Sequence, residues 1–195
     1  MLLQAAWSGP PSGQFTNGPD NQAIIDLEGG SYLLSAPLLF PAAGGGGIAF
    51  RDGAIRASPA FPMDNSSALL MLTNTNATGH PDSACCWYEF IYFTNLVLDG
   101  SLRTGCARVH GATRIVFDET FFTGYRTTGL YYGSPSHQLL VSRSFFGTSD
   151  WRGLPGKHEV CETMSHAWEN IGLHVDGPDN QVRSALDSRR GTSLA

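Results

Sequence analysis

The sequence is poor in charged residues, and this shortage limits the classes of protein that fit it. Asp, Glu, Lys and Arg make up 15% of its 195 residues, well below the usual share of about a quarter. The 12 basic residues stand against 17 acidic ones, which gives a net charge of −5. No basic stripe is present, so a nucleic acid is not expected as a partner.

Long apolar runs and helical periodicity are also missing. No apolar run approaches the roughly 18 residues that a membrane span requires, so we expect a soluble chain with no membrane partner. Met1–Trp7 (MLLQAAW) has no basic start, and Ser8–Pro11 (SGPP) follows it before the apolar region of a signal peptide forms. No stretch holds a 3.6-residue period, which excludes helical repeats.

Cysteine is scarce and does not form a metal-binding pattern. The spacing does not match a zinc site, and we expect neither a metal nor a cofactor. If the chain is secreted, one or two disulfides are possible; free thiols in the core are the other possibility. The four cysteines are Cys85, Cys86, Cys106 and Cys161.

Two N-glycosylation triplets favour secretion. Asn65-Ser66-Ser67 and Asn76-Ala77-Thr78 both lie in a polar stretch rich in turn residues. We therefore expect Asn65 and Asn76 to be glycosylation sites of a protein that lies outside the cell or in a cell wall.

What the chain does contain is a repeat. RIVFDETFFTG starts at Arg114, and QLLVSRSFFGT starts 24 residues later at Gln138. Ile91-Tyr92-Phe93 stands 24 residues before Ile115-Val116-Phe117, so three segments share one register. With 23 glycines and many Thr, Ser and aromatic residues, the composition is that of an all-β protein with short turns.

A second series of segments interleaves with the first. Its members begin at Gly105 (GCARVHG), at Gly129 (GLYYGSP), 24 residues on, and at Gly172 (GLHVDGP), 43 residues further. The longer interval leaves room for an insertion at about residues 149–168. Two interleaved series predict two strand regions in every repeat.

This period is the one that a coil of a parallel β-helix needs, because each coil buries its apolar side only by stacking on the next. The sequence predicts an all-β, right-handed, single-stranded parallel β-helix of roughly six or seven coils. Ile91, Ile115 and Leu139 should form one inward stack. We expect an irregular segment at 1–22, the β-helix at 23–185 and a disordered tail at 186–195.

Several segments resemble a known family. Asp26–Pro41 (DLEGGSYLLSAPLLFP), Gly53–Ser58 (GAIRAS), Tyr88–Ser101 (YEFIYFTNLVLDGS) and Ser144–Trp151 (SFFGTSDW) are similar to plant QUARTET-type polygalacturonases, pectin-lyase-fold proteins related to glycoside hydrolase family 28. The resemblance implies a right-handed parallel β-helix, secretion to a cell wall and hydrolysis of polygalacturonan. Members of the family are longer, so we expect a fragment or a shortened gene product.

The catalytic motifs of the related hydrolases are matched only in part. The first catalytic aspartate of their N-T-D-G motif corresponds to Thr128, and one coil later a single acid, Asp150, stands where two aspartates would be. An inverting glycosidase needs an acid and a base roughly 6.5–9.5 Å apart. Asp150 and Glu169, which opens the next coil, are the candidate pair, and we expect weak or absent activity.

Strand alternation predicts a wall of the binding groove. If Leu130 and Tyr132 point inward, Tyr131 points outward, and so does His174 on a neighbouring coil. An outward aromatic ring and an imidazole suit stacking on a sugar and bonding to its hydroxyl groups. Arg103 and Arg126 are expected beside this face, where they would bind uronate carboxylates.

Three functions remain open, and polygalacturonan or a related acidic polysaccharide is the expected partner of a monomeric chain. The first is a polygalacturonase-like glycoside hydrolase. The second is a catalytically silent polysaccharide binder with the same fold, and the third is a pectate lyase-like protein.

We assign structural roles to Asp99, Glu119 and Asp118, with Asp118 stacked on Thr94 and Ser142 in a polar ladder.

Overall fold

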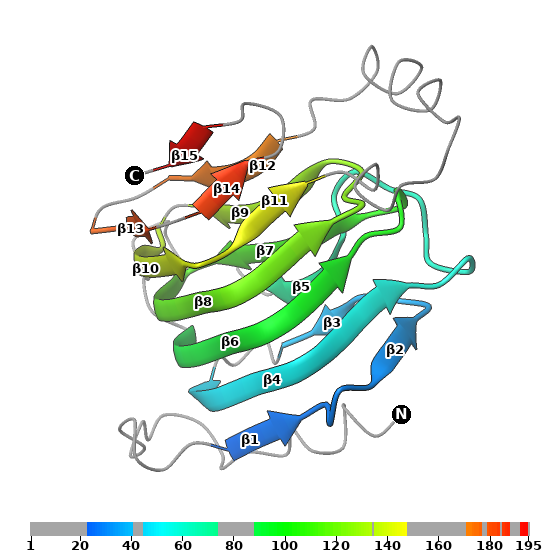
Figure 1. Ribbon diagram of the computed structural model, residues 1–195, viewed down its shortest axis with the longest axis horizontal. Coiled ribbons are helices and arrows are strands. Elements are labelled where there is room, and N and C mark those ends of the chain that lie inside the picture. Colours follow the sequence, from blue (N-terminus) through cyan, green and yellow to red (C-terminus); the bar gives the residue numbers. More distant parts are fainter. Residues whose placement is uncertain are drawn as a thin grey trace, which may run out of the picture.

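The structure is a computed structural model, and every regular element in its described part is a β-strand (Figure 1). None of these residues form a helix long and apolar enough to cross a membrane. The described residues are 23–40, 45–73, 88–133, 135–147, 171–176, 179–183, 185–187 and 192–194.

The strands lie in two sheets. The larger, sheet A, has ten strands, and the smaller, sheet B, has five. Sheet A contains β1 (Ala23–Asp26), β2 (Ser31–Leu34), β4 (Gly45–Ala57), β6 (Tyr88–Asp99), β8 (Ala112–Thr123), β10 (His137–Ser142), β11 (Phe145–Gly147), β13 (Gln181–Arg183), β14 (Ala185–Asp187) and β15 (Thr192–Leu194). Sheet B contains β3 (Leu38–Leu39), β5 (Ala68–Leu72), β7 (Gly105–His110), β9 (Thr128–Gly133) and β12 (Ile171–Val175).

The chain alternates between the sheets, from β4 to β5, back to β6, and onward in the same way to β9 (Figure 1). Neighbouring strands are parallel, apart from the antiparallel pair of β14 and β15. The fold is therefore the predicted right-handed parallel β-helix, with the hand that crossovers between parallel strands adopt. The β14–β15 pair lies largely in the segment for which the sequence predicts a disordered tail.

The 24-residue register of the sequence is the register of sheet A. Ile91 pairs with Ile115, and Ile115 with Leu139, on three successive strands. All three side chains are buried, so the predicted inward stack is confirmed.

The repeated Phe-Phe pairs divide between the core and the surface. Phe122 and Phe146 are buried and stack at 4.6 Å between ring centroids. Phe121, by contrast, is 43% exposed, and its ring centroid lies 6.2 Å from that of Phe145. In the same core, Phe93 stacks on Phe117 at 4.7 Å between ring centroids. One member of each pair therefore continues a core ladder, and the other forms a separate outer ladder.

Two columns of left-handed residues bend the long strands of sheet A. A positive φ is unfavourable for a residue with a Cβ, so its recurrence at one coil position marks a bend that the stacking enforces. One column consists of Glu28, Asp52, Asn95, Glu119 and Arg143, and the other of Gly47, Phe90, Arg114 and Gln138.

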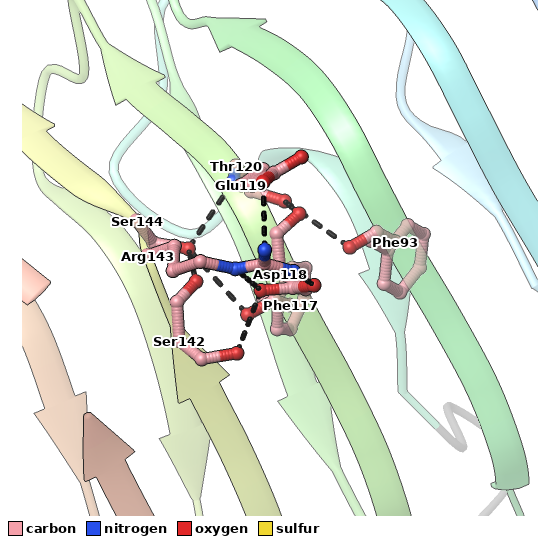
Figure 2. Close-up of polar contacts among 8 residues, drawn as sticks. All are labelled: Phe93, Phe117, Asp118, Glu119, Thr120, Ser142, Arg143 and Ser144. Atoms are coloured by element: carbon pink, nitrogen blue, oxygen red, sulfur yellow. Dashed lines mark hydrogen bonds and ion pairs between the residues drawn. The ribbon is translucent and has the colours of Figure 1, made fainter. Parts of the chain in front are cut away.

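A polar ladder lies on the outside of the bend that contains Glu119 and Arg143 (Figure 2). Asp118 pairs with Thr94 on one side and Ser142 on the other, and the Ser142 hydroxyl donates to its Oδ1 at 2.7 Å. Arg143 binds Asp118 and lies 3.0 Å from Glu119. The predicted ladder is confirmed, and the Arg143 hydrogen bond holds the pKa of Asp118 below its ordinary value.

Cys106 is a free, buried thiol. Its Sγ donates to the carbonyl oxygen of Leu98 at 3.1 Å, and burial raises its pKa. For this cysteine the free core thiol is the correct alternative; Cys85, Cys86 and Cys161 lie outside the described residues.

Candidate functional site

The outer face of sheet B carries one row of side chains that crosses all five strands. Leu130 and Tyr132 are buried, while Tyr131 between them is only partly buried, and His174 pairs with Tyr131 on the next strand. The predicted inward and outward directions in β9 are therefore confirmed. Strand pairing aligns the outer row as Leu39, Met71, Arg108, Tyr131 and His174.

Three members of this row stack on one another. The Arg108 guanidinium carbon lies 4.7 Å from the centre of the Tyr131 ring. On the far side, the imidazole of His174 is 4.8 Å from the same ring, with 12° between the planes. We call these residues the Arg108–Tyr131–His174 stack. Cation–π and aromatic contacts hold it together.

The stack changes what Tyr131 can do. Because β7 and β12 lie on opposite sides of β9, Arg108 covers one face of the phenol ring and His174 covers the other. A sugar ring therefore cannot stack on Tyr131 while the stack is intact, in contrast to the role expected from the sequence. The guanidinium N–H groups, the phenol hydroxyl and the imidazole remain as hydrogen-bonding groups.

Because Gly133 has no side chain, the Tyr131 ring can occupy the space above it. The glycine follows Tyr131 on the same face of β9, and a Cβ at Gly133 would lie 2.4 Å from Cε1 of Tyr131. That distance is far below any real contact, so the ring lies across the glycine backbone. His110, which pairs with Gly133, is exposed and adds a second imidazole beside the stack.

Arg108 differs from the arginines of sheet A. Arg51, Arg114 and Arg143 each pair with a carboxylate, whereas in the described part of the chain Arg108 has no ion pair and contacts the Tyr131 ring instead. A guanidinium without a carboxylate partner keeps its donors for an external acceptor. Arg108 is thus a candidate site for an acidic group.

Arg103 and Arg126 lie in consecutive turns that lead into sheet B, at the edge where its strands begin. Arg103 Nε donates to the carbonyl oxygen of Phe61 at 2.8 Å, and Arg126 Nε donates to Asn65 Oδ1 at 3.2 Å. Both side chains therefore bond to the turn between β4 and β5, which comes one turn before that of Arg103 and two turns before that of Arg126. They border the outer face of sheet B but are not part of the stack.

Thr128 is the first residue of β9 and is partly exposed. It pairs with Ile171 of β12, so it stands at the entry to a sheet B strand, where the resemblance places the first catalytic aspartate. Asp150, Glu169 and Asn76 lie outside the described residues. Among the residues that are described, no three His, Cys, Asp or Glu side chains form a group able to hold a metal ion.

Asp99 is a buried carboxylate with a local role. Its Oδ1 accepts the backbone N–H of Ser101 at 2.9 Å, and Oδ2 lies 3.9 Å from Arg56 Nε. These contacts fix the turn that follows β6, in agreement with the structural role assigned from the sequence.

The sequence interpretation missed Arg108 because the two sheets differ in register. Aligning Gly105 with Gly129 puts Arg108 beside the inward Tyr132, but the structure pairs Arg108 with Tyr131, 23 residues on. The turn after β8 spans residues 124–127 and the one after β6 spans 100–104. The difference of one residue was a usable signal, since both turns lie between recognisable strand patterns.

The fold and this row define a parallel β-helix protein with one aromatic and cationic row on its smaller sheet. Over 188 residues the chain is 33% identical to Polygalacturonase QRT3 of Arabidopsis thaliana, a match that covers 94% of this chain and 36% of that protein. No protein-family model matches the chain, and no solved structure matches it significantly. The chain is a relative of the QUARTET-type polygalacturonases, as its motifs predict, and spans about a third of the length of this relative.

Proposed function

We propose that the chain binds an acidic polysaccharide of the pectin class, polygalacturonan, along the outer face of sheet B, and that it is a polygalacturonase-like glycoside hydrolase relative with weak or absent activity. Similarity to a polygalacturonase supports this assignment over 94% of the chain. The proposed location is the cell wall or the extracellular space, where such a polymer is found.

The observation that carries the proposal is the Arg108–Tyr131–His174 stack. Its members stand on three neighbouring strands, which are spaced about 4.8 Å apart, so the row runs along the helix axis. A linear polymer lying along this row would meet a guanidinium, a hydroxyl and an imidazole in turn. Arg108 suits a uronate carboxylate, and the other two suit sugar hydroxyls.

Weak or absent hydrolysis follows from Thr128. A threonine hydroxyl cannot serve as a general acid or base near neutral pH, and it occupies the position of an aspartate in the related hydrolases. Any remaining turnover would then depend on Asp150, with Glu169 as the partner acid. A catalytically silent binder is the second candidate, and the same threonine favours it.

Two measurements on the full chain test the proposal. Isothermal titration calorimetry should detect binding of a hexamer of galacturonic acid, and no binding of a neutral hexamer of galactose. Release of reducing ends from polygalacturonate should be very slow or undetectable, and Asp150→Asn should abolish any release while binding persists. Equal binding of the two hexamers would contradict the acidic substrate, and fast hydrolysis that survives Asp150→Asn would contradict the catalytic assignment.

A further inference from the structure

The turn between β4 and β5 presents an N-glycosylation triplet in an ordered, exposed form. Asn65 is exposed, and Asp64 before it fixes the backbone that follows. Its Oδ1 accepts the backbone N–H of Ser66 at 2.8 Å and that of Ser67 at 2.6 Å. The asparagine therefore lies on the outside of a turn that side-chain hydrogen bonds define.

The contact with Arg126 leaves the reactive atom of Asn65 available. An arginine side chain only donates hydrogen bonds, so the Arg126 Nε bond of 3.2 Å must be to the amide oxygen of Asn65. In a planar amide the nitrogen is the other substituent on the carbon and is turned away from that contact. Because an N-linked glycan replaces one hydrogen on the amide nitrogen, the glycosylated residue keeps its oxygen for Arg126.

The turn lies at the edge of the proposed binding face. Ser67 Oγ shares a hydrogen bond of 2.9 Å with Thr104 Oγ1 of the next turn, and Arg126 of the turn after that donates its backbone N–H to the carbonyl oxygen of Thr104 at 2.9 Å. These three turns lead into β5, β7 and β9. A group attached to Asn65 would stand where the strands of sheet B begin.

We propose that Asn65 carries an N-linked glycan in the secreted protein, and that this glycan stands beside Arg126 at the edge of sheet B. The alternative is that Asn65 is only a hydrogen-bonding partner of Arg126. The proposal rests on the secretion that belongs to the proposed function. It is tested with the chain directed into the secretory pathway, so failure at Asn65 does not bear on polysaccharide binding.

The full chain, fused to a cleavable signal peptide, is secreted from plant cells, and peptides that contain Asn65 are analysed by mass spectrometry. N-glycans are released enzymatically in ¹⁸O-labelled water, which converts a glycosylated asparagine to labelled aspartate. We expect the label at Asn65 in most molecules. An unlabelled Asn65, in a culture whose other secreted glycoproteins are labelled, would overturn the proposal.

Two variants separate glycosylation from the hydrogen bond to Arg126. Asn65→Asp keeps an oxygen for Arg126 but cannot accept a glycan, so it should be secreted with the mass of one glycan missing. Ser67→Thr keeps the triplet and a hydroxyl for Thr104, and it should retain the glycan. If Asn65→Asp shows no loss of glycan mass, the proposal is wrong, and the direct analysis of the unaltered chain decides the matter if that variant is not secreted.

Discussion

The two sheets of this β-helix use repetition in opposite ways. In sheet A one side-chain type recurs along an inward column, as Phe50, Phe93 and Phe117 do on β4, β6 and β8. The outer row of sheet B changes at every strand, through Leu39, Met71, Arg108, Tyr131 and His174. Repetition thus marks positions that stack in the core. Where the side-chain type changes from strand to strand, the surface is not constrained by stacking and can carry binding groups.

Register separates the two sheets as well. Sheet A holds 24 residues from Ile91 to Ile115 and again to Leu139, whereas sheet B takes 23 from Arg108 to Tyr131. The turn before β9 is one residue shorter than the turn before β7. Counted between paired residues, the chain from β9 to β10 is one residue longer than the chain from β7 to β8, so the core ladders of sheet A keep their register. Turns can therefore change in length without disturbing the stacked core, provided that the changes cancel.

The strongest test of this comparison is made within one Phe-Phe pair. Phe122→Ala should lower the free energy of unfolding by about 3–5 kcal/mol, because a buried ring leaves a cavity. Phe121→Ala, at the neighbouring residue on the outside, should lower it by less than about 1 kcal/mol. Urea denaturation monitored by circular dichroism gives both values. Similar losses in the two variants would show that the inner and outer ladders are not distinct.

Most of the fold could be predicted because residues that stack on successive coils recur at a constant interval in the sequence. Ile91, Ile115 and Leu139 recur at a constant interval since each packs on the next coil, and a constant interval is visible without a structure. The inward Leu130 and Tyr132 followed from alternation alone.

The outer row of sheet B could be predicted only in part. Tyr131 and His174 were found because they flank inward residues of a recognised strand. Arg108 was missed because aligning Gly105 with Gly129 hides the one-residue difference between the turns before β7 and β9. The stacking of Arg108 and His174 on both faces of Tyr131 also lay beyond the sequence, because it depends on side-chain conformations across three strands.

The second prediction tests whether the sheet B row binds the acidic polymer. Arg108→Met keeps an apolar side chain over Tyr131 but removes the charge. It should weaken binding of the galacturonic acid hexamer by roughly ten- to a hundredfold, since a hydrogen bond to a charged group contributes about 1.5–3 kcal/mol. Arg114→Met is the matched control, because Arg114 also covers an aromatic ring, that of Phe90, at 4.8 Å but lies on sheet A.

Calorimetric titration of both variants measures the effect. Arg114→Met should bind the hexamer as the unaltered chain does. An equal loss in the two variants would indicate that net charge, and not the row, governs binding.

A smaller effect is expected from Gly133→Ala, which alters the row without removing any member of it. The added Cβ would lie 2.4 Å from the Tyr131 ring, so the ring must move. Hexamer binding should weaken by a few-fold at most, and the free energy of unfolding should change by less than about 1 kcal/mol because the displaced ring is not in the core. In the background of Tyr131→Ala the same substitution should have no further effect on binding, and an additive loss would contradict the steric explanation.

The smallest effect belongs to the polar ladder of sheet A and should depend on pH. The Arg143 hydrogen bond lowers the pKa of Asp118 in the folded chain below the value of about 3.9 expected when unfolded. The ionised carboxylate therefore stabilises the fold above about pH 4, and this contribution is lost as the pH falls through the folded pKa.

Asp118→Asn should accordingly lower the free energy of unfolding near neutral pH by no more than about 1 kcal/mol, since the Arg143 side chain is 61% exposed and solvent screens the pair. The loss should shrink in high salt and disappear as the pH falls through the folded pKa of Asp118. Arg143→Gln is the matched control, because it removes the other partner and should lose stability in the same pH window. Urea denaturation across that range measures both variants. A loss that stays constant from neutral to acidic pH would show that Asp118 stabilises the bend through its hydrogen bond from Ser142, whose hydroxyl lies 2.7 Å from Oδ1, and not through its charge.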